Sequence, residues 1–186
     1  MSSTIYWCKD CNIPIYEKVC PICGNEGKYV ATDVRPVFPE ENALISILLK
    51  KNPKEYQCAS VWYGSGAYII DGKKIKLSVS KVNKLPIEDI RIIKEQYENF
   101  VVDINYEFFD DYIVKFIKAN KDRYNYITEE AVNYIQQYQD KYKIEDMMVS
   151  FSGGKDSTVT SHLVNRALGT NKVLHIFGDT TLEFPY

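Results

Sequence analysis

The spacing of apolar residues predicts a small β-containing module in the first half of the chain. Residues 41–51 carry apolar positions at helical spacing, whereas 56–63 and 67–79 are rich in the aromatic and β-branched residues typical of strands. The dipeptide Asp71-Gly72 interrupts the second strand-like run. Because a type I′ turn needs positive φ at both central residues, this dipeptide predicts a tight hairpin.

The middle of the chain changes to helical spacing and predicts three helices in series. Pro86 suits the first position of a helix, because its φ is already helical and its missing N–H has no partner there. The apolar residues of this helix and the next recur mostly three or four positions apart: Ile87, Ile90, Ile93, Tyr97 and Phe100, then Phe109, Tyr112, Ile113, Phe116 and Ile117. Thr128 predicts the N-cap of a third helix, which carries Ala131, Ile135, Tyr138 and Tyr142.

Beyond the helices, two strand-length apolar runs enclose one more helical segment. Residues 146–151 and 172–177 are the apolar runs, and 157–168 between them has helical spacing followed by Gly169, a favourable C-cap. A helix that connects two buried strands places them parallel in one sheet. The end of the chain therefore predicts a βαβ unit.

Composition and charge narrow the functional classes. The 186 residues are 45% hydrophobic and 26% charged with a formal net charge of -2, which is typical of a soluble globular protein and gives no general attraction to nucleic acid or anionic lipid. No run reaches the ~20 apolar residues that span a bilayer, and the N-terminus lacks the apolar core of a signal peptide. We therefore expect no membrane contact and a cytoplasmic protein.

Two CxxC pairs near the N-terminus predict a structural zinc site. The residue after each pair, Asn12 or Gly24, tolerates the left-handed conformation that turns both thiolates toward one point. A redox pair, plain structural thiols or an iron site are the alternatives. Cys58 stands apart in a strand-like stretch and is interpreted as a small buried hydrophobe. The expected zinc ligands are Cys8, Cys11, Cys20 and Cys23.

Together these patterns predict an α/β protein in four segments. They are a zinc ribbon at 1–30, a small β-containing module at 31–85, a helical connector at 86–143, and the first part of a nucleotide-binding parallel sheet at 144–186.

The stretch SGGKDS at residues 152–157 lies between the first strand of the βαβ unit and its helix. Glycines allow a ligand to approach the backbone, and the first amides of a helix face an anion with the positive end of the helix dipole. The stretch therefore predicts a phosphate cradle. It differs from the Walker loop because Asp156, not a hydroxyl residue, follows Lys155; this acid requires a Mg²⁺ beside the phosphates or caps the helix.

SGGKDS after an apolar strand resembles the loop of the PP-loop, or N-type ATP pyrophosphatase, superfamily. FSGGKDST together with DTTLEFP at 179–185 is similar to the phosphoadenosine phosphosulfate reductase family within it. The N-terminal YWCxxCNxPI and CPICGNEG, followed by DVRP, resemble members that carry a zinc ribbon and a small β-domain. The resemblance touches both ends of the chain and implies an adenine nucleotide alpha hydrolase-like fold.

The resemblance also implies roles for individual residues. The phosphates of an adenine nucleotide would be held by Ser152, Gly153, Gly154, Lys155, Asp156 and Ser157. Asp179 and Thr180 would lie near the ribose or adenine. ATP would be cleaved between its α and β phosphates to give an adenylated substrate and pyrophosphate. Lys155 and Asp156 would be the catalytic residues, with Lys155 stabilising charge on phosphates that Mg²⁺ bridges.

Three functions are compatible with these features. The first is an adenylating or sulfur-transferring enzyme, with RNA or a sulfur-carrier protein as a possible partner. The second is a sulfonucleotide reductase, and the third is a non-catalytic binding module built on the zinc ribbon. Because the sequence stops after the second predicted strand, we expect an incomplete nucleotide-binding domain or a partner chain that completes its sheet.

Overall fold

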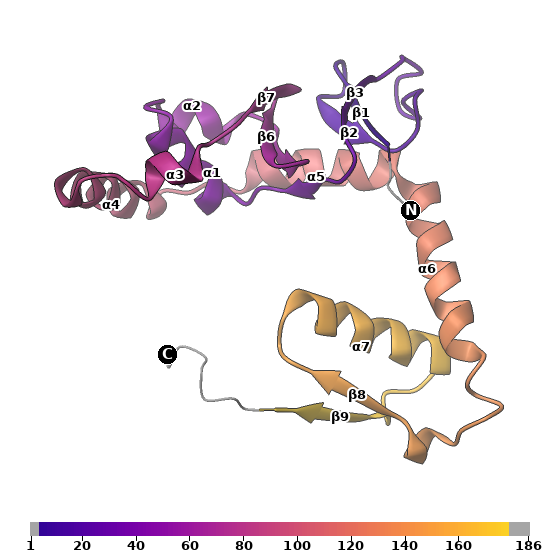
Figure 1. The fold of residues 1–186 in the computed structure, drawn as a ribbon. Helices are drawn as coiled ribbons and strands as arrows, with labels where there is room; N and C mark the ends of the chain where they lie inside the picture. The colour runs from indigo at the N-terminus through magenta and orange to yellow at the C-terminus, as the bar shows by residue number, and fades with distance from the viewer. Residues whose placement is uncertain (1–3, 179–186) are drawn as a thin grey trace. The chain divides into compact units, whose positions relative to one another are not determined.

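The computed structural model describes residues 4–178, and Figure 1 labels their helices and strands. Two compact units divide the chain, Met1–Lys121 and Asp122–Tyr186, and each is described by itself. The first unit holds two antiparallel sheets with helices, and the second holds a parallel strand pair with its connecting helix. The expected mixed α/β class is confirmed. The division into four segments stays a prediction.

The first sheet of the N-terminal unit is small and antiparallel. Ile5, Ile13 and Ile15 are fully buried, yet these strands are too short to enclose a core alone. They share one apolar cluster with Trp62, from the second sheet, and with residues of a later helix. The strands, in the spatial order β2-β1-β3, are β1 (Ile5–Cys8), β2 (Ile13–Ile15) and β3 (Lys28–Ala31).

The second sheet contains the predicted hairpin. Ile70 pairs with Lys73 across Asp71-Gly72, whose φ angles are 47° and 78°, as a type I′ turn requires. A Cβ on Gly72 would lie 2.6 Å from the Trp7 ring, so only glycine allows this close approach. The strands, in the order β4-β5-β6-β7, are β4 (Arg35–Pro36), β5 (Val61–Gly64), β6 (Ala67–Ile70) and β7 (Lys73–Ile75).

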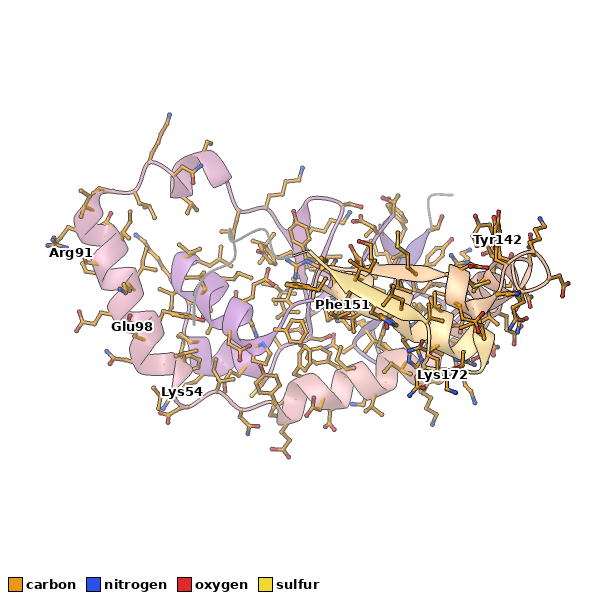
Figure 2. The ribbon with its side chains drawn as sticks, turned by 90° about the horizontal axis from the view of Figure 1, so that it is seen from below. Lys54, Arg91, Glu98, Tyr142, Phe151 and Lys172 are labelled. Atoms are coloured by element: carbon orange, nitrogen blue, oxygen red, sulfur yellow. The ribbon has the colours of Figure 1, made fainter. Side chains whose placement is uncertain are left out.

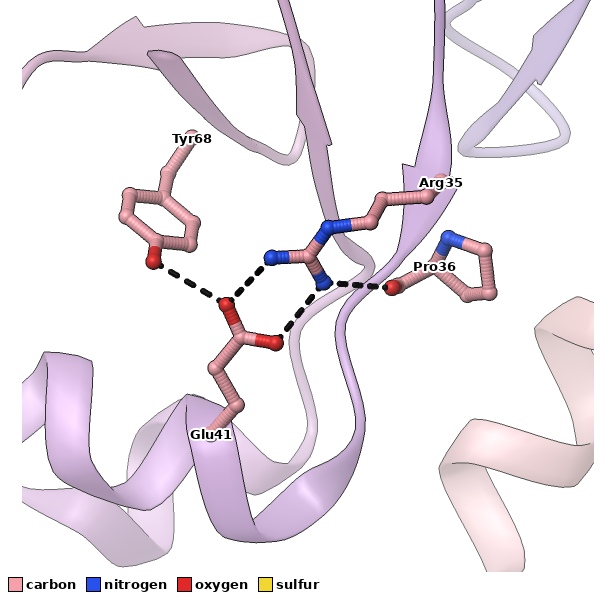
Figure 3. A network of polar contacts seen from close by, with 4 residues as sticks. All are labelled: Arg35, Pro36, Glu41 and Tyr68. Carbon is pink, nitrogen blue, oxygen red and sulfur yellow. Dashed lines mark hydrogen bonds and ion pairs between the residues drawn. The ribbon is translucent and has the colours of Figure 1, made fainter. Parts of the chain in front are cut away.

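Polar contacts join β4 to a helix and to the middle of the same sheet. The Arg35 guanidinium donates two hydrogen bonds to Glu41, of 2.8 and 2.7 Å, and a third of 3.2 Å to the Pro36 carbonyl. Tyr68 of β6 donates to the same carboxylate at 3.0 Å, as Figure 3 shows. Asp33, which precedes β4, accepts a 2.7 Å hydrogen bond from the Ser65 amide. The DVRP segment thus has a structural role in this sheet.

Two helices lie between β4 and β5, and the second corrects a sequence expectation. α1 (Pro39–Leu48) matches the predicted helix, whereas residues 53–57 form α2 (Pro53–Gln57) where strand had been expected from Tyr56 onward. Pro53 stands at the first helical position and the Asn52 side chain accepts from the Lys54 amide, so local capping outweighs β propensity. Cys58 follows this helix and is exposed, so its interpretation as a buried hydrophobe was wrong.

Three helices follow the second sheet in the N-terminal unit. The amphipathic face predicted for α4 is present, but none of the residues of this helix is buried, and Pro86 is its N-cap rather than its first residue. The third of these helices, α5, packs through Phe116, whose ring centroid is 4.6 Å from that of Trp62. The helices are α3 (Val79–Val82), α4 (Ile87–Val101) and α5 (Glu107–Ala119).

Asn120 ends α5 and ties it to the first sheet. Its side-chain amide donates to the carbonyls of Phe116 and Pro14, at 2.8 and 3.2 Å, and its carbonyl oxygen accepts from the Tyr16 amide at 2.9 Å. Asn120 is 8% exposed. A buried amide with all these partners fixes the end of the helix against strand β2.

Helix α6 (Lys121–Gln136) belongs to the C-terminal unit except for its first residue, and it overturns the predicted cap at Thr128. Thr128 is buried in the interior of this helix. No proline or glycine lies between Lys121 and Thr128, so helical hydrogen bonding extends to the earlier start. The predicted continuation through Tyr138 and Tyr142 is also wrong, because the helix ends at Gln136.

The predicted βαβ unit is confirmed. After a 3₁₀ turn, Ile144–Asp146, β8 (Met148–Phe151) and β9 (Leu174–Phe177) pair in parallel, with α7 (Lys155–Leu168) between them in sequence (Figure 1). Gly169 caps the helix at φ 64°. The core of this unit is small, with Val149, Leu168 and Val173 buried. Within residues 4–178, no helix is long and apolar enough to cross a bilayer.

Candidate functional site

The four N-terminal cysteines converge on one point in the first unit. Cys8 ends strand β1 and Cys11 follows in the turn, while Cys20 and Cys23 come from the segment between β2 and β3. The four Sγ atoms all lie within 4.8 Å of one another. Sequence spacing therefore identified a cluster that the fold brings together.

Each CxxC pair is shaped by its backbone. Asn12 has φ 56° and Gly24 has φ 76°, the left-handed values expected after each pair. The Cys11 amide donates to the Cys8 Sγ at 3.4 Å, and the Gly24 amide donates to the Cys20 carbonyl at 2.8 Å. These turns direct both sulfurs of each pair toward the centre of the cluster. Asn12 also donates to Asp71 at 2.7 Å, which ties the first turn to the second sheet.

Burial and close packing of the sulfurs act on the pKa values of the cluster thiols. Burial raises the pKa of the Cys8 and Cys11 thiols, and the neighbouring cysteines raise the pKa of Cys11 further. Burial acts the same way on Cys20, but hydrogen bonds from the amides of Cys23 and Ile22 outweigh it and lower that pKa. A divalent metal removes the repulsion between thiolates and stabilises all four in the ionised form.

The sulfur positions fit a tetrahedral metal. Zinc bound to four thiolates at about 2.3 Å implies sulfur–sulfur distances of about 3.8 Å. The Cys8 and Cys23 sulfurs are 3.4 Å apart and the Cys11 and Cys20 sulfurs 3.8 Å apart, far longer than a disulfide bond. The cluster can therefore hold a metal ion such as zinc, with no coordination position left for a substrate.

The glycine-containing loop of the second unit connects β8 to α7. Gly153 has φ 77°, which only glycine adopts freely, and Gly154 is the N-cap of the helix. The Ser157 hydroxyl donates to the Gly154 carbonyl at 2.9 Å, and the Ser152 hydroxyl lies 3.3 Å from that of Ser157. The two serines thus define the shape of the loop, and either hydroxyl can rotate toward a ligand.

The first turn of α7 is open to an anion. No side chain caps this helix, and within residues 4–178 no loop or cap hydrogen bond uses the amides of Lys155, Asp156 and Ser157. Amides at a helix N-terminus carry the positive end of the helix dipole and attract phosphate. The loop therefore has the donors that the cradle hypothesis requires.

The space beside the two glycines is empty. A Cβ on Gly153 would meet no atom within 4 Å, and one on Gly154 would meet only the Ser152 hydroxyl at 3.5 Å. Gly154 also has ordinary backbone angles, φ -77° and ψ 167°, so neither crowding nor strain within the chain demands glycine there. Two physical reasons for glycine remain at this position: it is a favourable N-cap, and it lets a ligand approach the backbone.

The charged side chains of the loop make no ion pair in the described part of the chain. Lys155 and Asp156 are exposed, and neither takes part in the ion pairs found there. The other two predicted nucleotide contacts, Asp179 and Thr180, lie outside the described residues. Phe151 and Phe177 are register partners, so the chain leaves both parallel strands at the same edge of the sheet, beside the loop.

One contact near the loop was not predicted. The Ser161 hydroxyl of α7 lies 2.7 Å from Nε2 of His175 on β9, and Nδ1 of His175 lies 2.8 Å from the Val173 carbonyl. Because a carbonyl only accepts, Nδ1 carries a proton, and in the neutral ring Nε2 then accepts from Ser161. This contact holds α7 against β9. No sequence motif marks it, since it depends on the register of helix and strand.

Comparison with known proteins gives a partial match. The NAD synthase family model matches residues 127–178, which include the loop. Two uncharacterized proteins of Methanocaldococcus jannaschii are similar to this chain. One is 32% identical over 115 residues, which are 61% of this chain and 25% of that protein. The other is 29% identical over 121 residues, which are 65% of this chain and 24% of that protein. The chain thus spans about a quarter of the length of these relatives. No solved structure matches it significantly.

The family match and the geometry agree on the type of domain. A parallel β8-α7-β9 unit carries a glycine loop at the N-terminus of its helix, within the residues that match NAD synthase. Residues 127–178 are therefore an adenine nucleotide alpha hydrolase-like region of the PP-loop superfamily.

Proposed function

We propose that residues 152–157 bind the phosphates of ATP, and that the chain is part of an enzyme that adenylates its substrate or transfers sulfur to it. The observation that supports this most directly is the loop itself. It follows a parallel strand, contains a glycine at φ 77° and opens a helix whose first turn is uncapped. The assignment to the phosphoadenosine phosphosulfate reductase family, from FSGGKDST and DTTLEFP, is part of the proposal.

The proposed reaction cleaves ATP between its α and β phosphates. A nucleophile of the substrate attacks the α phosphorus, the bond to the bridging oxygen breaks, and pyrophosphate leaves with the electron pair. Lys155 stabilises the charge on the departing phosphates, and the loop amides orient them. Asp156 would hold a Mg²⁺, which supplies further neutralisation of phosphate charge when bound. Asp179 and Thr180 would contact the ribose or adenine.

The cysteine cluster has a supporting role in this proposal. Four thiolates around zinc leave no open position, so the metal stabilises the first sheet and performs no chemistry. RNA and a sulfur-carrier protein are the acceptors compatible with sulfur transfer. The parallel strand pair exposes apolar residues, among them Met148 at 67% and Leu174 at 58%, and we propose that a further chain segment or partner covers them.

Nucleotide binding tests the cradle directly. Titration calorimetry with Mg²⁺-ATP should detect binding, and Lys155→Ala should weaken it about tenfold or more, because a charge-assisted contact to phosphate is lost. Lys172→Ala is the matched control: this lysine precedes β9, is exposed, and is shown in Figure 2. Its removal should leave affinity within about twofold. Equal binding by Lys155→Ala and the parent chain would contradict the cradle.

Competition and product assays separate the alternatives. Release of pyrophosphate and AMP from bound ATP supports the adenylating enzyme. Displacement of ATP by phosphoadenosine phosphosulfate at much lower concentration, without pyrophosphate release, would favour the sulfonucleotide reductase. A chain that binds neither nucleotide would favour the zinc-ribbon binding module.

A further inference from the structure

A large cleft in the N-terminal unit belongs to neither candidate site. Its volume is 1140 Å³, and its walls come from α1, α2, the segment after β7, and α4. The cysteine cluster and the glycine loop contribute no residue to it. A cleft of this size exceeds what most small ligands need.

The floor of the cleft is aliphatic. Its lining includes Ile47 of α1, Leu77 after β7, and Ile92 and Ile93 of α4. Two residues of the apolar stripe of α4, Ile93 and Phe100, line the cleft and are only half-buried, and the neighbouring Ile92 is 48% exposed. A helix with an apolar stripe normally buries that stripe, so an unfilled one beside a cleft indicates a binding surface.

One wall of the cleft is cationic. Four exposed lysines line it, and none makes an ion pair with any described residue. Asp89 and Asp103, on the α4 side, are the acidic residues of the lining, so positive charge predominates locally in a chain of net charge -2. Figure 2 labels Lys54, one of these lysines, and Arg91 and Glu98 of α4. The lysines are Lys50, Lys51, Lys54 and Lys76.

The chemistry of the lining selects among anionic partners. Single-stranded nucleic acid needs aromatic faces on which bases stack, and Phe100 is the one aromatic residue of the lining in the described chain. An aliphatic floor with a charged rim is the form that binds an amphipathic helix. A helix about 10 Å wide has a cross-section of roughly 80 Å², so the cleft corresponds to about 14 Å of helix, or roughly nine residues.

We propose that this cleft binds an amphipathic helix of a partner protein, with apolar residues toward Ile92 and Ile93 and acidic residues toward the lysine wall. The inference is independent of the nucleotide site, which lies in the other unit. It gives the N-terminal unit a recognition function in addition to its metal site.

A designed peptide pair tests the charge requirement. The probe is a dye-labelled helix of about twelve residues, with leucines at helical spacing and glutamates flanking them; its control has lysines in place of the glutamates. Fluorescence anisotropy with the full 186-residue chain should show saturable binding of the acidic peptide. The basic peptide should bind at least about tenfold more weakly, because it faces like charge.

Variants with matched controls locate the binding. Ile92→Glu should weaken binding of the acidic peptide about tenfold or more, whereas Ile87→Glu should change it less than about twofold. Both are exposed isoleucines of α4, but only Ile92 lines the cleft. Lys76→Glu should likewise weaken binding, and Lys73→Glu, an exposed lysine of β7 outside the cleft, should not. Because all four side chains are at the surface, the fold should be unaffected.

Several results would overturn the proposal. They are equal binding of the acidic and basic peptides, no binding of the acidic peptide at about 1 mM, and equal effects of the cleft variants and their controls. Preferential binding of a single-stranded RNA that competes with the peptide would also overturn it, because the cleft would then be a nucleic-acid site. Nucleotide binding at Lys155 plays no part in any of these measurements.

Discussion

The two candidate sites differ in how much of each is assembled by the chain itself. At the cysteine cluster, four sulfurs from two turns already lie within 4.8 Å, and Cys8 and Cys20 are buried. At the glycine loop, five of residues 152–157 are exposed, and Lys155 and Asp156 have no ion-pair partner among the described residues. The first site is closed around its ligand position, and the second is open toward it.

This difference indicates what each ligand does for the protein. Metal binding free energy adds directly to folding when the ligands lie at the ends of the strands of a small sheet and in the segments that connect them. A nucleotide that binds an open loop uses amides that are already in place. The fold of the loop therefore depends little on the bound nucleotide. The first ligand is therefore expected to be structural and the second to be exchangeable.

Loss of one cysteine should have the largest effect on stability. If it did not, the contrast between a structural and an exchangeable ligand would be wrong. We expect Cys11→Ser to lose zinc and to unfold the first sheet, since a structural zinc site of this kind contributes on the order of 10 kcal/mol. Metal content by atomic absorption and hydrogen exchange of β1 to β3 would measure it. Cys58→Ser is the control, because Cys58 is exposed and outside the cluster. A Cys11→Ser protein with full metal content and unchanged exchange would show that the cluster does not hold the ion.

Substitution of each glycine of the loop should separate folding from binding. Gly154→Ala should cost about 0.5 to 1 kcal/mol as a cap change, and the new methyl group enters the empty space of the cradle and should weaken Mg²⁺-ATP binding about tenfold or more. Gly153→Ala adds a methyl group at φ 77° and should cost about 1 kcal/mol of stability as well. Thermal unfolding and calorimetric titration measure the two effects. If Gly154→Ala bound nucleotide normally, the open space would have no functional role.

The same difference explains which features could be predicted from the sequence. The cysteine cluster, the Asp71-Gly72 turn and the β8-α7-β9 unit were predicted because each depends on residues close together in the chain. In each case a backbone requirement, such as positive φ at Asn12 or Gly72, limits the residue types that fit. Local rules therefore identified both candidate sites.

The features that were missed depend on neighbours distant in sequence. Thr128 has the residue type of an N-cap, but the helix starts at Lys121, after the buried Asn120 has bonded to β2. The Ser161 to His175 contact depends on helix and strand register. The unfilled face of α4 looks like an ordinary core-facing stripe, because the sequence shows that a helix is amphipathic but not what covers it.

A smaller effect on the free energy of unfolding tests whether polar contacts of the first unit, like its metal cluster, stabilise the fold. The paired hydrogen bonds from Arg35 lower the pKa of Glu41 despite burial, which acts in the opposite direction. A carboxyl group with a lowered pKa stabilises the fold above its unfolded pKa, and this contribution is lost as the pH falls through the lowered value. Because the pair is partly exposed, we expect Glu41→Gln to cost about 1 kcal/mol at neutral pH. Asp156→Asn, where the carboxylate has no ion-pair partner among the described residues and interacts only with the dipole of α7, should cost less, about a few tenths of a kcal/mol. Urea unfolding measures the free energy of unfolding of both variants. The difference in this free energy between the parent chain and Glu41→Gln should shrink in acid. Acid acts on the thiolates of both proteins alike, so the difference excludes that effect. A difference that stayed constant below the lowered pKa would show that packing, rather than the ion pair, accounts for it.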